Sequence, residues 1–201
     1  MNLAFLRSVQ QALSRARLPI MTVALVYAVS VIVGAVMVHS GNQFAVSTRD
    51  NVVSSAQNST ILVAYRSGNR LGAAFLDFGS NLLLGAAPQT LGGLGVLPPY
   101  VLAAYRGWIG GIVSIDSNHE SRLANPDSAR YYASVLVLQL IPYSLTGGAG
   151  VNLGWAYLRP ALHYRGDKWL GLPKEAILDV FRIYALSVPL FFVASLVEFL
   201  A

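Results

Sequence analysis

The chain has no cysteine among its 201 residues. Disulfide bonds, thiolate metal ligands and cysteine nucleophiles are therefore excluded. Charged residues are also scarce: they make up 11% of the chain, against about 25% in soluble domains. Hydrophobic residues make up 55%. This composition is typical of a protein with several membrane-spanning helices.

The chain also lacks any dense basic patch, although its net charge is +5. Its 14 Lys and Arg residues are scattered singly through the termini and loops. Such a distribution fits anionic lipid headgroups better than nucleic acid. We therefore expect membrane lipids and other integral membrane proteins as partners, no nucleic acid, and either a homo-oligomer or a hetero-oligomer.

Long apolar segments predict an all-α, polytopic transmembrane bundle of about five spans, forming one domain over residues 1–201. The predicted spans are Met21–Val38, Asn81–Leu97, Tyr100–Ile115, Tyr131–Tyr157 and Ile177–Leu200. The first is too long for the apolar part of a signal peptide and has no small-residue cleavage site after it, so we expect a true span.

Before the first span, residues Met1–Arg17 interleave apolar side chains with three arginines. This pattern predicts an amphipathic helix on the cytoplasmic surface, ended by Pro19. Five spans place the two termini on opposite sides. With the N-terminus inside, seven Lys and Arg residues flank the spans on the cytoplasmic side and five on the other: Arg7, Arg15, Arg17, Arg159, Arg165, Lys168 and Lys174 against Arg49, Arg66, Arg70, Arg122 and Arg130. This bias favours a multi-pass protein of the cytoplasmic (inner) membrane with a cytoplasmic N-terminus.

Between His39 and Phe78, polar and apolar residues alternate too often for a span. We expect helical pieces that lie on the membrane interface or dip into it. The second span contains Pro88 and the glycines Gly92, Gly93 and Gly95, so it is either kinked or broken and re-entrant. Pro98 and Pro99 are expected to form the turn after it. Residues 116–130 form the clearest aqueous loop.

Glycines mark two helix faces. Gly147, Gly150 and Gly154 lie three and four residues apart and therefore share one face. Gly107 and Gly111 have the GxxxG spacing. Because lipid tails are as apolar as leucine, membrane helices associate through close backbone approach at small residues. We expect both faces to contact other helices or partner proteins.

Several polar side chains fall inside or beside the predicted spans. A charge at the bilayer centre costs about 2.5–3.5 kcal/mol, so each one needs a structural or functional reason. Arg106 either bonds to the bundle interior, with Asp77, Asn81 or Gln139 as partner, or holds a lipid phosphate or anionic substrate. Glu198 is either solvated near headgroups or contacts a neighbouring helix or partner. The remaining candidates are Asn152 and a local Asp179–Arg182 pair.

Catalytic patterns are not found. His39, His119 and His163 are predicted in loops, and His119-Glu120 does not continue as HExxH. Ser144 and Thr146 have no histidine or lysine within helical reach to act as a base. We predict no catalytic residue, no metal site and no cofactor, and hence a protein that is not an enzyme.

Three motifs in order resemble one family. Asn81 with Tyr105–Gly111 resembles an "N … NGxxxG" pattern, residues 146–154 (TGGAGVNLG) resemble an "AGxxGxxxG" segment, and Val188-Pro189 with Glu198 resembles a closing "VP … E" helix. These patterns are those of the stage II sporulation protein M (SpoIIM) family, and they cover residues 81–201.

The chain departs from the family pattern at three places. Arg106 replaces an asparagine, Ser134-Val135 replaces a Pro-His pair, and Gln139 replaces a glutamate. The resemblance implies a bacterial five-span protein. In spore formers such a protein anchors cell-wall hydrolases at the septum, where peptidoglycan is remodelled.

Two functional hypotheses follow. The first is a non-enzymatic membrane subunit or scaffold that packs against partner membrane proteins, either as such an anchor or as an accessory subunit of a larger assembly. The second is a small transporter or lipid-handling protein in which the broken second span and Arg106 line a path.

Overall fold

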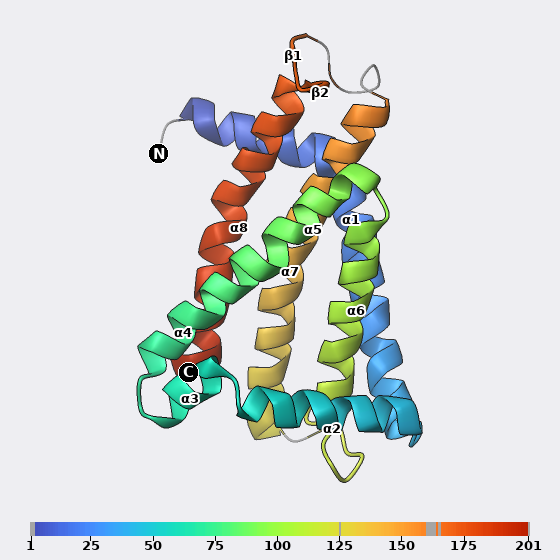
Figure 1. Cartoon of the computed structure of the whole chain (residues 1–201), viewed down its shortest axis with the longest axis vertical. Coiled ribbons are helices and arrows are strands. Elements are labelled where there is room, and N and C mark those ends of the chain that lie inside the picture. The colour runs from blue at the N-terminus through green and yellow to red at the C-terminus, as the bar shows by residue number, and fades with distance from the viewer. Residues whose placement is uncertain (1–2, 125, 160–163, 165, 201) are drawn as a thin grey trace.

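The computed structural model describes residues 3–124, 126–159, 164 and 166–200, most of which are helical (Figure 1). The elements are α1 (Leu3–His39), α2 (Gln43–Gln57), α3 (Thr60–Arg66), α4 (Arg70–Gly79), η1 (Ser80–Ala86), α5 (Ala87–Gly92), η2 (Gly93–Gly95), α6 (Pro98–Val113), α7 (Pro126–Leu158), β1 (Lys168–Trp169), β2 (Leu172–Pro173) and α8 (Lys174–Leu200). The two strands form a minimal antiparallel hairpin between α7 and α8. The all-α prediction is confirmed.

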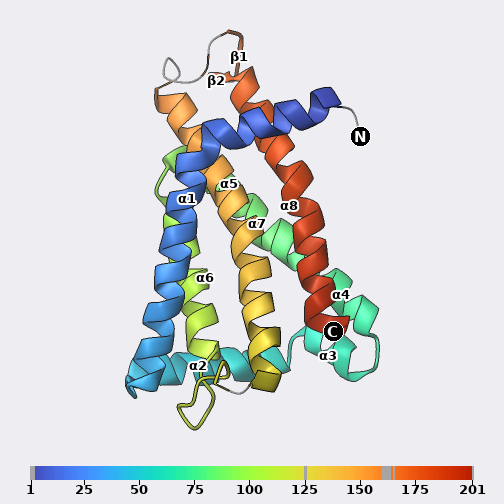
Figure 2. The same ribbon diagram turned by 180° about the vertical axis from the view of Figure 1, so that it is seen from behind.

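The long helices form a bundle along the longest axis of the molecule. The second part of α1, α6 and α7 run along this axis, and α8 slants away from them (Figures 1 and 2). The α4–α5 segment crosses the bundle as a diagonal rod, and α2 lies across the lower end (Figure 1). The N-terminal part of α1 lies at the upper end, whereas α8 ends at the lower one (Figure 1).

The helix α1 continues through Pro19 to His39. The predicted helix end at Pro19 is therefore wrong, because the amphipathic segment and the first span form one helix. Figure 2 shows this helix turning from a crosswise to a lengthwise course. Proline lacks an N–H, and its ring presses on the carbonyl four residues earlier, here that of Arg15. We assign the bend to this local cause.

The helical pieces expected between His39 and Phe78 are present as α2, α3 and α4. Each begins at a capping side chain, namely Asn42, Ser59 and Asn69, which accepts a hydrogen bond from the backbone N–H three residues later. Such caps satisfy donors that the first helical turn leaves unpaired. The helix starts are therefore set locally by polar residues.

The predicted second span, 81–97, is divided into three pieces. A π-helical stretch, η1, continues α4; α5 follows with Pro88 in its first turn, and the 3₁₀ turn η2 ends it. The chain reverses near Val96, which has a positive φ of 63°.

The expected turn at Pro98 and Pro99 is wrong, since both prolines begin α6. A helix start suits proline because the missing N–H would be unpaired there. Likewise, α7 begins at Pro126, inside the predicted loop 116–130.

Three helices are long and apolar enough to cross a membrane: α1, α7 over Ala129–Leu158, and α8. They contain the first, fourth and fifth predicted spans. The second and third predicted spans correspond to the interrupted η1–α5–η2 segment and to α6, which has 16 residues. Neither meets the same criteria of length and hydropathy within the described residues.

The centre of the bundle forms where α1, α6, α7 and α8 meet. The ring of Tyr143 packs edge-on against that of Phe191, with their centroids 4.8 Å apart. Around them lies one buried apolar cluster that also contains Val23, Tyr27, Ala86, Ala103 and Val151. The phenol of Tyr143 carries a polar group into this core, and the candidate site is built around it.

Candidate functional site

Glycines bring α1 and α6 into backbone contact. A Cβ atom placed on Gly107 or Gly111 of α6 would overlap carbonyl oxygens of α1. From the other side, a Cβ on Gly34 of α1 would overlap a carbonyl oxygen of α6. The predicted GxxxG pair thus lies at a helix crossing inside the chain. Sequence reasoning did not single out Gly34, which completes the crossing.

The glycine face of α7, formed by Gly147, Gly150 and Gly154, packs against α5 and η2. A Cβ on Gly150 would lie 2.6 Å from the carbonyl oxygen of Thr90, and one on Gly154 would overlap the carbonyl oxygen of Gly93. The broken helix of the same chain therefore covers this face. Contact of these glycines with a partner protein stays a prediction.

An ionic cluster at the upper end is centred on Asp179 of α8, whose side chain is 1% exposed. Arg15 of α1 donates two hydrogen bonds of 2.6 Å to its carboxylate. Arg182 donates a third at 2.8 Å, and Glu175 accepts hydrogen bonds from both arginines. Two guanidinium groups and two carboxylates balance each other. The predicted Asp179–Arg182 pair is part of a cluster that ties α1 to α8.

Tyr164 extends this cluster to α7. Its hydroxyl donates to Asp179 at 2.9 Å and accepts from the side-chain amide of Asn152 at 2.6 Å. Burial raises the pKa of the Tyr164 phenol, and the neighbouring Asp179 carboxylate raises it further. The phenol therefore stays protonated at neutral pH and remains a donor. Asn152, one of the predicted polar positions, serves as a structural link here.

A second polar chain crosses the middle of the bundle. Asp77 accepts hydrogen bonds from Asn81 at 2.8 Å and from Ser195 at 2.7 Å. The hydroxyl of Tyr143 donates to Asn81 at 2.6 Å and accepts from Arg106 at 2.8 Å. Three of the predicted polar residues, Asp77, Asn81 and Arg106, are thus connected through Tyr143, which sequence reasoning missed.

Arg106 is held by an aromatic ring rather than by an acid. Its guanidinium lies 4.2 Å from the centroid of the Tyr143 ring, which is cation–π geometry. Within the described parts of the chain, no carboxylate approaches it within 4 Å. Its Nε is buried and has no hydrogen-bond partner there. Arg106 thus bonds to the bundle interior through Tyr143 and not directly to Asp77, Asn81 or Gln139, the three predicted partners. Its alternative role, holding a lipid phosphate or an anionic substrate, stays a prediction.

Glu198 contacts a neighbouring helix. Gln139 of α7 donates a hydrogen bond of 2.9 Å to its carboxylate. Both residues line a cavity of about 580 Å³ that Arg106 also lines. Five tyrosines contribute to its wall: Tyr27, Tyr105, Tyr131, Tyr132 and Tyr143. A cavity with an arginine and a glutamate that are not paired with each other can hold a polar ligand.

The sequence offered little signal for the residues it missed. Arg15 belongs to an amphipathic pattern that indicates a headgroup-facing residue, and 164 positions separate it from Asp179. Tyr143 directly follows Pro142 in apolar sequence, where a tyrosine has no distinguishing neighbour. Ser195 lies three residues before Glu198 and Tyr143 four residues after Gln139, so each is about one helical turn from a predicted site residue.

Comparison with known proteins and protein families shows to which family the chain is similar. No curated protein and no solved structure is similar enough to this chain to count as a match. The sequence profile of the stage II sporulation protein M family, SpoIIM, matches residues 23–200. This region includes the three motifs described above and reaches back into α1, nearly the whole chain. The chain therefore belongs to the SpoIIM family.

Proposed function

We propose that the protein is a non-enzymatic integral membrane subunit whose helix bundle packs against partner membrane proteins. Family membership and three long apolar helices support a membrane protein. The segments between the long helices are short helices, turns and a two-residue-strand hairpin. Most of the described surface is therefore helix surface, and contacts made by helix faces suit a partner inside the bilayer.

The glycine crossings carry this proposal. At the α1–α6 and α7–η2 crossings, glycines lie against carbonyl oxygens of the neighbouring helix. Close-packed interiors transmit strain and have few alternative arrangements. Helices locked in this way favour a rigid scaffold over a carrier whose helices must slide during each cycle.

The exposed side of α1 is a surface suited to a partner. Large apolar residues recur on it at helical spacing: Leu18, Met21, Leu25, Val29, Ile32 and Val36. In a spore former the partner would be a wall-remodelling enzyme, as the family resemblance implies. In another organism it would be a subunit of a larger membrane assembly.

Cross-linking in native membranes tests this proposal. Because the chain has no cysteine, single cysteines at Leu25 or Ile32 give site-specific attachment of a photoreactive group without background from other positions. We expect discrete protein adducts, identified by mass spectrometry, from these exposed positions. A cysteine at Ala103, which is fully buried, is the matched control and should give none. If cross-linking from exposed positions of α1, α6 and α8 yields lipid adducts alone, the subunit proposal is wrong.

We further propose that all five predicted spans cross the bilayer, in the cytoplasmic membrane, with the N-terminus on the cytoplasmic side. The α4–α5 rod and α6 run between the same two ends of the bundle as the three long helices (Figure 1). A short or interrupted helix is tolerated at membrane depth where neighbouring helices cover it.

Arg106 favours a second candidate function, the handling of a small solute or lipid. It lines the 580 Å³ cavity together with Glu198 and has no acidic partner within 4 Å in the described chain. Intramembrane charges that face a cavity often mark transport paths. A flux assay in liposomes with wild type and Arg106→Gln separates the two functions. If neither protein conducts while Arg106→Gln loses its partner adducts, the transport candidate is excluded.

A further inference from the structure

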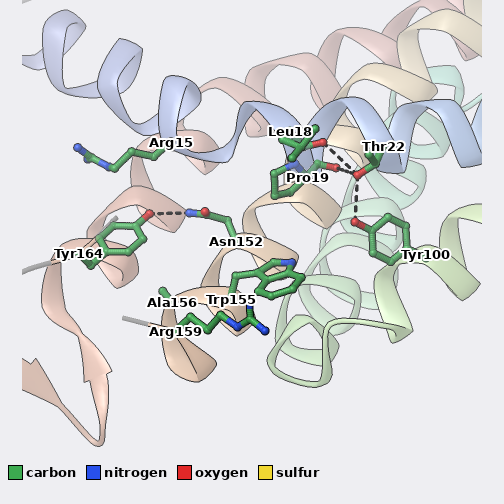
Figure 3. A pocket seen from close by; sticks show the side chains of 10 residues that line it. All are labelled: Arg15, Leu18, Pro19, Thr22, Tyr100, Asn152, Trp155, Ala156, Arg159 and Tyr164. Atoms are coloured by element: carbon green, nitrogen blue, oxygen red, sulfur yellow. Dashed lines mark hydrogen bonds between the residues drawn. The ribbon is translucent and has the colours of Figure 1, made fainter. Parts of the chain in front are cut away.

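A second cavity, of about 290 Å³, lies at the upper end of the bundle (Figure 3). It is formed under the bend of α1, beside the start of α6 and the end of α7. Leu18 and Pro19 of α1, Tyr100 of α6, and Trp155 and Ala156 of α7 supply most of its wall. The lining is therefore largely apolar and aromatic, drawn from three helices that are distant in sequence.

Arg159 supplies the available positive charge of this cavity. It follows the last residue of α7, and its guanidinium lies 5.5 Å from the centroid of the Trp155 ring. Across the described residues, no carboxylate lies within 4 Å of it. Arg15, the other arginine of the lining, already has the Asp179 carboxylate as a bidentate partner. The two cations thus differ: one is neutralised inside the bundle, and the other is open to an external anion.

Hydrogen-bonding groups surround the remaining wall. The hydroxyls of Thr22 and Tyr100 lie 3.0 Å apart, and the linked side chains of Asn152 and Tyr164 are on the opposite side (Figure 3). Hydroxyls can turn to donate to an oxygen ligand. The cavity therefore combines one cation and several neutral polar groups with an apolar floor.

The cavity lies at the more basic end of the molecule. Seven described Lys and Arg residues belong to the segments at this end, against three acids: Arg7, Arg15, Arg17, Arg159, Lys168, Lys174 and Arg182 against Asp167, Glu175 and Asp179. Tryptophan and tyrosine gather there as well, as they do at membrane–water interfaces. In the proposed orientation this end meets the anionic cytoplasmic leaflet.

We propose that this cavity binds the phosphate-bearing headgroup of an anionic phospholipid. Arg159 holds the phosphate, since a guanidinium offers paired donors matched to two phosphate oxygens. The hydroxyl of Thr22 and the side-chain amide of Asn152 contact the remaining headgroup oxygens. The apolar wall at Leu18 contacts the first carbons of an acyl chain. Basic pockets between helices on the cytoplasmic side are common places for such lipids. The lipid proposal rests on the proposed orientation of the bundle, which places this end in the cytoplasmic leaflet. It does not depend on the proposed protein partners.

Fluorescence of Trp155 tests the site directly. The chain has three tryptophans, so Trp108→Phe with Trp169→Phe leaves Trp155 as the only reporter. This protein is placed in two kinds of phosphatidylcholine vesicle, one with brominated phosphatidylglycerol and one with brominated phosphatidylcholine, whose bromines quench the Trp155 fluorescence. The brominated lipid is a minor component at the same mole fraction in both, with bromines at the same acyl positions. We expect the binding constant at the quenching site to be about fivefold higher for the anionic lipid than for phosphatidylcholine. This is the preference expected from one cation near a membrane surface.

The matched control separates a site from general surface charge. Arg159→Gln should abolish the preference, whereas Arg17→Gln, which removes an exposed arginine outside the cavity at the same end, should keep it. Both positions are exposed, so neither substitution disturbs the packed core. Equal quenching by the two lipids in the parent protein, or a preference that survives Arg159→Gln, overturns the proposal.

Inorganic phosphate distinguishes the two sources of the anion. If a lipid headgroup is the ligand, added phosphate at matched ionic strength leaves the lipid preference unchanged. If free phosphate removes the preference in the parent protein, the site binds the soluble anion and the lipid assignment is wrong.

Discussion

Gly111 shows how little room the α1–α6 crossing leaves. An added methyl group would overlap a backbone carbonyl oxygen of α1, which cannot turn away as a flexible side chain can. We expect Gly111→Ala to lower the free energy of unfolding in detergent by about 1–3 kcal/mol, the usual cost of overpacking. Reversible thermal or denaturant unfolding followed by circular dichroism measures this change.

Gly79→Ala is the matched control for this prediction. Gly79 is also helical, but a Cβ placed on it meets no atom within 4 Å. Alanine favours a helix over glycine by about 1 kcal/mol, so the substitution should be neutral or stabilising. Equal destabilisation by the two substitutions would mean that loss of backbone flexibility, not the crossing, decides the effect.

Asp179 is the second residue with a large predicted effect. Asn at this position removes the charge that holds Arg15 and Arg182, leaving both with Glu175 as their remaining carboxylate partner among the described residues. Breaking a buried pair costs about 3–5 kcal/mol, and we expect the lower end because both arginines are partly exposed. Unfolding measurements on Asp179→Asn test this prediction.

Asp167→Asn provides the comparison. Asp167 pairs with Lys174, but both side chains are more than half exposed. Exposed pairs contribute about 0.2–1 kcal/mol, so this substitution should change stability little. A similar loss in the two variants would show that burial of Asp179 is not what makes its pair important.

At the scale of elements, hydropathy predicted three of the helices well because each is a long apolar run with polar ends. The break assigned to Pro19 failed because a proline bends a helix when the residues around it still gain from packing. The π-helical stretch of η1 was not predictable either. Within it, a Cβ placed on Gly85 would overlap the Tyr143 hydroxyl, so this close approach involves residues far apart in the chain.

The candidate site, like the helices, was predictable from the sequence only in part. The sequence identified Asp77, Asn81 and Arg106 as unusual polar residues in apolar surroundings. In the structure all three belong to one hydrogen-bonded chain. Their connection was not readable, because Tyr143 joins them across helices. The cost of burying charge identifies which residues need a partner, but it does not say which residue that partner is.

The bend of α1 gives a prediction at this scale. Pro19→Ala restores a backbone donor and removes the ring that presses on the preceding turn. We expect the N-terminal part of α1 to straighten and move away from the hairpin. Spin labels on Gln10→Cys and Lys168→Cys should then give a longer or broader distance distribution by electron paramagnetic resonance.

Pro189→Ala, which removes the proline inside α8, is the control and should leave this distance unchanged. An unchanged distribution in Pro19→Ala would assign the bend to the Arg15–Asp179 contact instead of the proline. In that case Asp179→Asn would be the substitution that releases the N-terminal segment.

For the whole molecule, the number of membrane passes depends on where the turn between α5 and α6 lies. If the α4–α5 rod and α6 cross the bilayer, Gly95 lies on the same side as Ser14 of α1. Asn51 of α2 and Asn118 then lie on the opposite side. If only α1, α7 and α8 cross, Gly95 stays on the side of Asn51 and Asn118. The position of one glycine therefore separates three spans from five.

Single cysteines at these four exposed positions can be labelled with a membrane-impermeant maleimide in oriented membranes, because the natural chain contributes no cysteine. We expect labelling of positions 51 and 118 from outside the cell, and of positions 14 and 95 only after the membrane is opened. Gly95 suits this test, since an added Cβ makes only ordinary contact with Pro98. Labelling of positions 51, 95 and 118 from outside, with position 14 protected, would exclude the five-span arrangement. Outside labelling of positions 14 and 95, with positions 51 and 118 protected, would instead reverse the orientation and place the basic end, with its proposed lipid site, in the outer leaflet.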